Sequence, residues 1–106
     1  MQYNHNVFVN CPFDKKYQPF EDVIVFTVMC CGFKPRSAKE SSASHNRLFK
    51  IQKIIEECDF AVHDISRTEL DKKNKLPRFN MPFELGLFLG AQCFGGREHL
   101  EKSCIT

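Results

Sequence analysis

Short apolar runs alternate along this chain with longer segments in which apolar residues recur at helical spacing. Residues 7–9 are an apolar run of strand length, and residues 60–64 have the pattern of a buried strand that ends in a carboxylate, Asp64. Residues 33–38 predict a weaker strand, and Pro35 places it at a sheet edge because proline cannot donate to a strand ladder. Residues 102–106 have the pattern of a fourth strand, inside which the chain stops.

Helical periodicity fills the segments between these runs. A first helix is predicted over residues 17–31, ending at Gly32, and a second over residues 47–58. The first helix is expected to bury one face, made by Tyr17, Phe20, Ile24, Thr27, Val28 and Cys31. The second has an apolar stripe and a charged face that is typical of a solvated surface, made by Arg47, Lys50, Lys53, Glu56 and Glu57.

Strands and helices therefore alternate, which predicts an α/β fold with three layers and a parallel sheet. An edge position for the Pro35 strand favours a flavodoxin-like strand order, 2-1-3-4. We expect residues 1–106 to form a single domain, truncated at its C-terminus because the fourth strand is not followed by further elements.

A third helix is predicted from residue 80, and it carries one charge among apolar residues. Asn80 is expected as its N-cap and Pro82 lies in its first turn. Glu84 follows, and the positive end of the helix is expected to favour its ionised form. Gly86 and Gly90 share one face, which indicates that another group approaches closely. Whether Glu84 is chemically active or only caps the first turn stays open at this point.

Composition narrows the function class. Hydrophobic residues make up 42% and charged residues 26% of the 106 residues, as in a soluble globular chain. A net charge of +2 gives no support for nucleic-acid or membrane binding. The N-terminus lacks the pattern of a signal peptide, so a cytoplasmic location is expected.

The six cysteines show neither a CxxC pair nor a cysteine–histidine cluster with metal-ligand spacing. Because four of them lie in apolar helical patterns, we expect buried free thiols and no metal site.

Three segments should meet where the carboxyl ends of parallel strands form a crevice: residues 10–14, 64–66 and 80–84. This placement brings Asp64 and Glu84 together, and a carboxylate pair is one way to divide the work of breaking a bond to a sugar. His63 should point to the opposite side of its strand and belong to the core. The cationic loop at 65–79 is either a phosphate-binding lid or a solvated run. No GxGxxG or P-loop sequence is present.

A strand ending in Asp64, a variable loop, and then Asn-Met-Pro-Phe-Glu-Leu-Gly at 80–86 resembles the nucleoside 2-deoxyribosyltransferases. It is also similar to bacterial TIR-like proteins, which share that fold and often cleave NAD. Residues 7–14 and 78–91 are similar to those of a small TIR-like set, so the resemblance spans nearly the whole chain.

The resemblance implies chemistry at an N-glycosidic bond. Glu84 would attack or stabilise the anomeric carbon, and Asp64 would contact the sugar or assist proton transfer. The implied substrate-binding residues are Asn10, Cys11, Pro12, Phe13, Ser66, Asn80 and Pro82. Cys11 replaces the glycine of many transferase first loops, and the transferases' late asparagine has no counterpart here.

The expected function is therefore cleavage or transfer of a nucleotide's N-glycosidic bond, in bacterial signalling or antiphage defence. NAD is the candidate substrate, no cofactor is implied, and a homo-oligomer or a partner effector domain is expected. The alternative is a non-catalytic module that binds a nucleotide or assembles through TIR-type contacts.

Overall fold

A four-stranded parallel sheet forms the centre of the computed structural model, which describes residues 5–41, 46–65 and 80–106. The strands are β1 (Asn6–Asn10), β2 (Lys34–Arg36), β3 (Phe60–His63) and β4 (Ser103–Ile105), and their order is β2-β1-β3-β4. The predicted flavodoxin-like order is thus confirmed. Pro35 lies in β2 at the sheet edge, where a missing donor costs no ladder bond.

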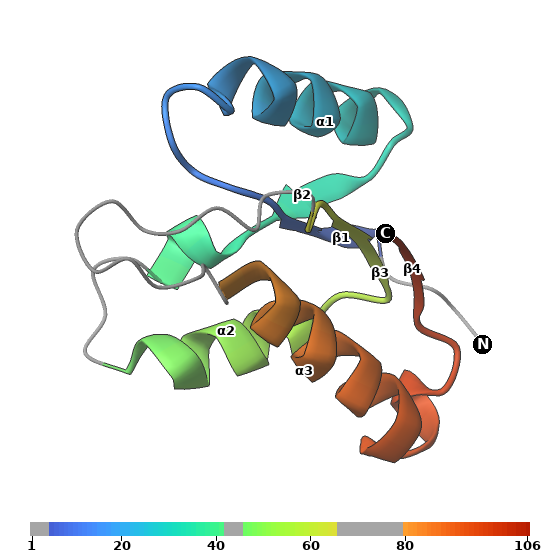
Figure 1. The fold of residues 1–106 in the computed structure, drawn as a ribbon. Coiled ribbons are helices and arrows are strands. Elements are labelled where there is room, and N and C mark those ends of the chain that lie inside the picture. Colours follow the sequence, from blue (N-terminus) through green and yellow to red (C-terminus); the bar gives the residue numbers. More distant parts are fainter. Residues whose placement is uncertain (1–4, 42–45, 66–79) are drawn as a thin grey trace.

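Helices cover both faces of the sheet (Figure 1). The helix α1 (Gln18–Cys30) lies on one face, and α2 (Arg47–Glu56) and α3 (Asn80–Phe94) lie together on the other. Two short 3-10 helices, η1 (Ala38–Ser41) and η2 (Arg97–His99), connect these elements. This is the three-layer α/β architecture that the sequence predicts. Among the described helices, none is long and apolar enough to cross a membrane.

Alternation along β1 divides the core into two clusters, because successive side chains of a strand point to opposite faces. Phe8 packs with Ala61 of β3 and with residues of α2 and α3, including Phe88. Val7 and Val9 pack on the other face, beneath Tyr17 and Val28. Because helices cover both faces of the sheet, Val7, Phe8 and Val9 are all buried, and this explains why residues 7–9 are uninterruptedly apolar.

The outer side of α1 departs from the sequence prediction. Tyr17 and Val28 are buried as expected, but Phe20, Thr27 and Cys31 of the predicted face are exposed. Glu21 is buried instead, where it forms an ion pair with Lys39. The solvent side of α1 carries four apolar side chains that are between 60% and 68% exposed: Phe20, Val23, Phe26 and Met29. Because α1 is apolar on all sides, hydrophobic periodicity alone could not identify its buried face.

All six cysteines lie among the described residues, and all are free thiols, as predicted. Cys11 and Cys58 are buried, and Cys104 is half-buried. The expectation of burial is wrong for Cys30, Cys31 and Cys93, which are exposed. Cys30 and Cys31 end α1 on a side that no other described element covers, and this is why an apolar pattern did not lead to burial there.

A buried lysine joins β4 to the end of α2. Lys102 Nζ donates hydrogen bonds to the main-chain oxygens of Ile55 (3.0 Å) and Cys58. The ammonium also lies 5.3 Å from the centroid of the Phe88 ring. Burial lowers the pKa of Lys102, whereas the negative end of α2 favours a cation. This contact fixes the segment before β4 against the layer formed by α2 and α3.

Replacing this lysine should destabilise the fold. Lys102→Met keeps most of the side-chain volume but removes the donor, so we expect the free energy of unfolding to fall by about 1–3 kcal/mol. Urea unfolding measures the change. Lys50→Met, at an exposed position of α2, is the matched control and should change the free energy by less than about 0.5 kcal/mol. Equal stability of Lys102→Met and the wild type would contradict this role.

Candidate functional site

The side chain of Asn10 brings three segments together at the carboxyl ends of the central strands. Its Nδ2 donates to the main-chain oxygen of Met81 (2.7 Å) and to Nδ1 of His63 (2.9 Å). Its main-chain oxygen accepts a hydrogen bond from the N–H of Asp64 (2.8 Å). The first loop, the end of β3 and the start of α3 therefore meet at this edge of the sheet, as the sequence predicts.

His63 belongs to the core, as predicted from its place one residue before Asp64. Its ring packs edge-on against Phe8 and Phe88, with centroid separations of 6.3 Å and 5.6 Å. Burial lowers the pKa of His63 to about 4, so the imidazole is neutral at pH 7. A neutral ring explains how Nδ1 accepts the hydrogen bond from Asn10.

Asp64 is held by a tyrosine that the sequence reasoning counted only as an apolar contact. The hydroxyl of Tyr17 donates to Oδ2 of Asp64. Asp14 positions Tyr17, because its Oδ1 accepts the main-chain N–H of Tyr17 at 2.9 Å. The sequence did contain an indication of this contact, because a tyrosine on a buried helix face needs a hydrogen-bond partner for its hydroxyl.

Glu84 lies in the second turn of α3 and is only 5% exposed. It lines a pocket of about 320 Å³ together with Arg47, Leu48, Ile51 and Phe83. Burial raises the pKa of Glu84 to about 7, and the nearby positive charge of Arg47 only partly opposes this. The carboxyl group is therefore poised between its two protonation states at neutral pH, and burial outweighs the stabilisation expected from the helix terminus.

The bounds of α3 also correct two expectations about its start. Asn80 is the first residue of the helix rather than the N-cap before it. No acidic residue falls in the first turn, so the interpretation of Glu84 as a first-turn capping carboxylate is wrong. Pro82 lies in the first turn, as predicted, and is exposed. Ser66 and the rest of the cationic loop lie outside the described residues, as does the side chain of Asn80.

The first loop contributes one accessible aromatic ring. Phe13 is 37% exposed, and the ammonium of Lys39 lies 5.0 Å from its ring centroid. The same ammonium forms a 2.7 Å ion pair with Glu21. Pro12, by contrast, is buried. Of the first-loop residues predicted to contact substrate, Phe13 is thus the one that can reach a ligand with the least rearrangement.

Cys11, the residue that follows β1, interacts electrostatically with both predicted carboxylates. Burial and the negative charges of Glu21, Asp64 and Glu84 together raise the pKa of its thiol to about 12, and the positive charge of Lys39 partly opposes them. A thiol with so high a pKa is a poor nucleophile, which agrees with a packed rather than a reactive residue. Both Asp64 and Glu84 are therefore within electrostatic range of the residue that follows β1.

The two carboxyl groups reach this point from opposite faces of the sheet. Asp64 bonds to Tyr17, which packs in the core beneath α1, and Glu84 lines the pocket between α2 and α3. Asp64 is not among the described residues that line that pocket. The predicted pair is thus brought to one edge of the sheet but not into one described pocket.

Arg47 is the residue at this site that sequence reasoning missed. The pattern assigned it to a solvated helix face, and it is indeed exposed. Its position at the first turn of α2 nevertheless places it on the wall of the Glu84 pocket. Only the packing of α2 against α3, which no local pattern encodes, distinguishes it from the other cations of that helix.

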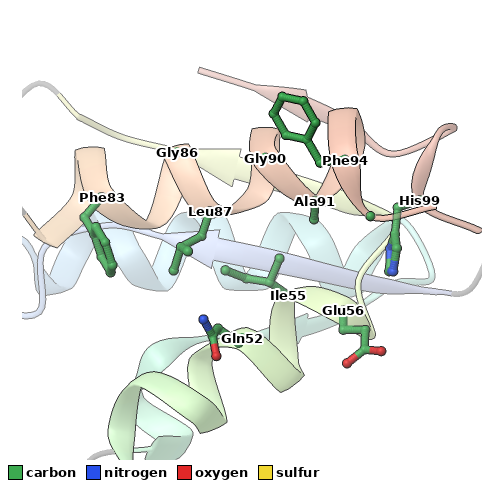
Figure 2. Close-up of a pocket in the computed structure, with 11 residues that line it drawn as sticks. Gln52, Ile55, Glu56, Phe83, Gly86, Leu87, Gly90, Ala91, Phe94 and His99 are labelled. Atoms are coloured by element: carbon green, nitrogen blue, oxygen red, sulfur yellow. The ribbon is translucent and has the colours of Figure 1, made fainter.

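A larger apolar groove of about 590 Å³ lies further along the same two helices (Figure 2). Gly86 and Gly90 both border it, which confirms that they share a face. Apart from the backbone of its own helix and its chain neighbours, no described atom lies within 4 Å of the Cβ position of either glycine, so the described part of the chain does not make the close approach expected there. The groove contains none of the residues predicted to carry the chemistry.

The described residues at this site include a group suited to acid–base chemistry. The described ranges contain no group of three or more His, Cys, Asp or Glu side chains that could hold a metal ion. A buried carboxyl group that titrates near neutral pH can act as a nucleophile when ionised and as a proton donor when neutral.

The burial of Glu84 predicts a pH-dependent stability. Because its pKa is higher in the folded chain than the ordinary value of 4.5, the stability it contributes is present below pH 4.5 and is lost as the pH rises through 7. Glu84→Gln removes this titration. Relative to the wild type, we expect the variant to gain on the order of 2 kcal/mol between pH 5 and pH 8.

Urea unfolding at several pH values measures this difference. Glu56→Gln, an exposed position on α2, is the control and should follow the wild type at every pH. A Glu84→Gln curve parallel to that of the wild type would contradict the burial of an ionisable carboxyl group at this position.

Comparison of the chain with models of protein families, with curated proteins and with solved structures finds no match. The candidate site is therefore defined by its own geometry: a buried carboxyl group that shares a pocket with an arginine, and an aspartate directly after β3 at the same edge of the sheet.

Proposed function

We propose that this chain is a TIR-like or deoxyribosyltransferase-like domain that cleaves or transfers the N-glycosidic bond of a nucleotide, with NAD as a candidate substrate. The observation that carries the proposal is Glu84. It is buried, has a pKa raised to about 7, lines a pocket, and lies within electrostatic range of the residue that follows β1. Burial of such a carboxyl group lowers the free energy of unfolding, and strongly shifted pKa values of buried groups are common at functional sites.

In the proposed reaction the ionised Glu84 attacks the anomeric carbon, or stabilises the cation that forms there. The bond from this carbon to the base nitrogen breaks, and the base leaves with the electron pair. Nicotinamide leaves NAD as a neutral molecule, whereas another base takes a proton from solvent. Water or a second base then attacks the same carbon and releases the Glu84 carboxylate. Proton transfer to or from Glu84 is favourable near neutral pH because its pKa matches the operating range.

Asp64 has the supporting role in this proposal. Its carboxylate accepts the hydroxyl of Tyr17, which limits its orientation, and it contacts a sugar hydroxyl or assists proton transfer. Tyr17 acts through Asp64 and is a positioning residue. Phe13, the accessible aromatic ring of the first loop, forms a wall against the base. Asn10 orders the site through Met81 and His63 rather than by contact with substrate.

A non-catalytic module is the second candidate, and a different observation favours it. The helix α1 exposes four large apolar side chains, Phe20, Val23, Phe26 and Met29, and apolar side chains gathered on one exposed element are typical of interaction sites. A domain of this type would bind a nucleotide at the Glu84 pocket and signal through a homo-oligomer or a partner effector domain. Bacterial signalling or antiphage defence is the setting that we propose for either candidate.

Release of the base distinguishes the two candidates. Incubation of the protein with NAD, and separately with deoxynucleosides and nucleoside 5′-monophosphates, should release free base, measured by chromatography. Glu84→Gln should lower kcat/KM by at least about 100-fold, because the amide neither attacks the sugar nor transfers a proton. Asp64→Asn should lower it less, and Glu56→Gln should leave it unchanged.

Equal base release by the wild type and Glu84→Gln would remove Glu84 from the catalytic assignment. Nucleotide binding without release of base by any variant would favour the non-catalytic module.

The pH profile is a further test of the assignment. If the ionised form of Glu84 is the reactive one, kcat/KM should rise as the pH increases from 5.5 to 8, with half of the rise near pH 7. Unfolding measurements at the same pH values separate this titration from loss of fold. A profile that is flat across this range would indicate that ionisation of Glu84 does not limit the reaction.

A further inference from the structure

The guanidinium of Arg47 has no partner in the described part of the chain, although it shares a pocket with an acid. Arg47 and Glu84 both line the pocket between α2 and α3. They make no ion pair within 4.0 Å, and neither side chain has a hydrogen bond to another described group. The three described ion pairs lie elsewhere, on Arg36 and Lys39.

This arrangement is unusual in its energetics. Glu84 is 5% exposed and makes no hydrogen bond to another described group, and burial disfavours the ionised form of a carboxyl group. An arginine on the wall of the same pocket would relieve that cost by pairing with Glu84, yet the two remain apart. The pocket therefore presents two separate polar groups that a ligand can contact at the same time.

The start of α2 adds a third feature that favours an anion near Arg47. Arg47 is the first residue of this ten-residue helix, and the first N–H groups of a helix have no partner within it. The preceding residue, Asn46, makes no side-chain cap, and the first turn carries no acidic residue. The positive end of the helix and the guanidinium thus act in the same direction, as they do at phosphate-binding helix termini.

We infer that Arg47, together with the N-terminus of α2, binds the 5′-phosphate of the substrate while its ribose extends toward Glu84. This inference rests on the proposed function and names its substrate class as a phosphorylated nucleotide rather than a free nucleoside. Guanidinium groups recognise phosphate through paired N–H donors, which gives orientation as well as affinity. A volume of about 320 Å³ is at the small end for ligand pockets and suits a sugar phosphate.

Binding of D-ribose 5-phosphate, measured by isothermal titration calorimetry, tests the inference without requiring turnover. The wild type should bind D-ribose 5-phosphate at least tenfold more tightly than D-ribose. Arg47→Gln should weaken the binding of D-ribose 5-phosphate by at least tenfold. Lys50→Gln is the matched control. The substitution removes the same charge from the same helix, but Lys50 lines a different pocket. Its affinity should stay within twofold of the wild type.

Arg47 is exposed and makes no hydrogen bond or ion pair with another described group, so thermal unfolding of Arg47→Gln should stay close to that of the wild type and verify its fold. Equal binding of D-ribose 5-phosphate by Arg47→Gln and the wild type would overturn the inference, as would a wild type that does not prefer the phosphorylated sugar.

Base-release assays on the same variants separate this inference from the proposed function. Arg47-dependent binding without release of base from any nucleotide would support the phosphate site and reject the catalytic proposal. Release of base from nucleoside 5′-monophosphates or NAD that is unaffected by Arg47→Gln would support the catalytic proposal and overturn the phosphate site.

Discussion

The hydrogen bonds of one amide side chain determine where the candidate site forms. Asn10 ends the central strand β1 and donates both of its N–H groups, one to His63 on β3 and one to the main chain of Met81 on α3. Nothing in the local sequence of β1 or of α3 brings the end of the strand to the start of the helix. Because both donors are used in a buried position, the start of α3 is held over the carboxyl ends of the strands. Glu84, three residues after Met81 and on the same side of the helix, is placed by the same contact.

Burial then determines the chemical character of the site. The neutral state of His63 lets it accept a hydrogen bond from Asn10, and the same apolar surroundings raise the pKa of Glu84 to about 7. Asp64 differs because it leaves β3 on the opposite face and meets the hydroxyl of Tyr17. Two carboxyl groups at one edge of the sheet are therefore held in different environments, which is how folds separate the roles of paired acids.

The sequence prediction and the structure agree where the hydrophobic pattern is compatible with only one arrangement of the elements. The strand order follows from three features: the alternation of elements, the proline in β2, and the apolar sequence of β1. The prediction and the structure differ where the hydrophobic pattern is compatible with more than one buried face. The helix α1 is apolar on all sides, so the burial of Glu21 and the exposure of Phe20 depend on how it rotates over β1. The bounds of α3 differ by one residue from the predicted cap at Asn80, because helix starts are set by local contacts that composition does not reveal.

By itself the sequence determined the parallel α/β fold, the core position of His63, and the meeting of three segments at one edge of the sheet. These follow from local periodicity and from the geometry common to all parallel sheets. Only the tertiary structure decided that Tyr17 holds Asp64, that Glu84 titrates near neutrality, and that Arg47 shares its pocket. Each of these depends on groups distant in the sequence, Tyr17 and Asp64 being 47 residues apart. Their proximity and their desolvation arise only when the layers pack together.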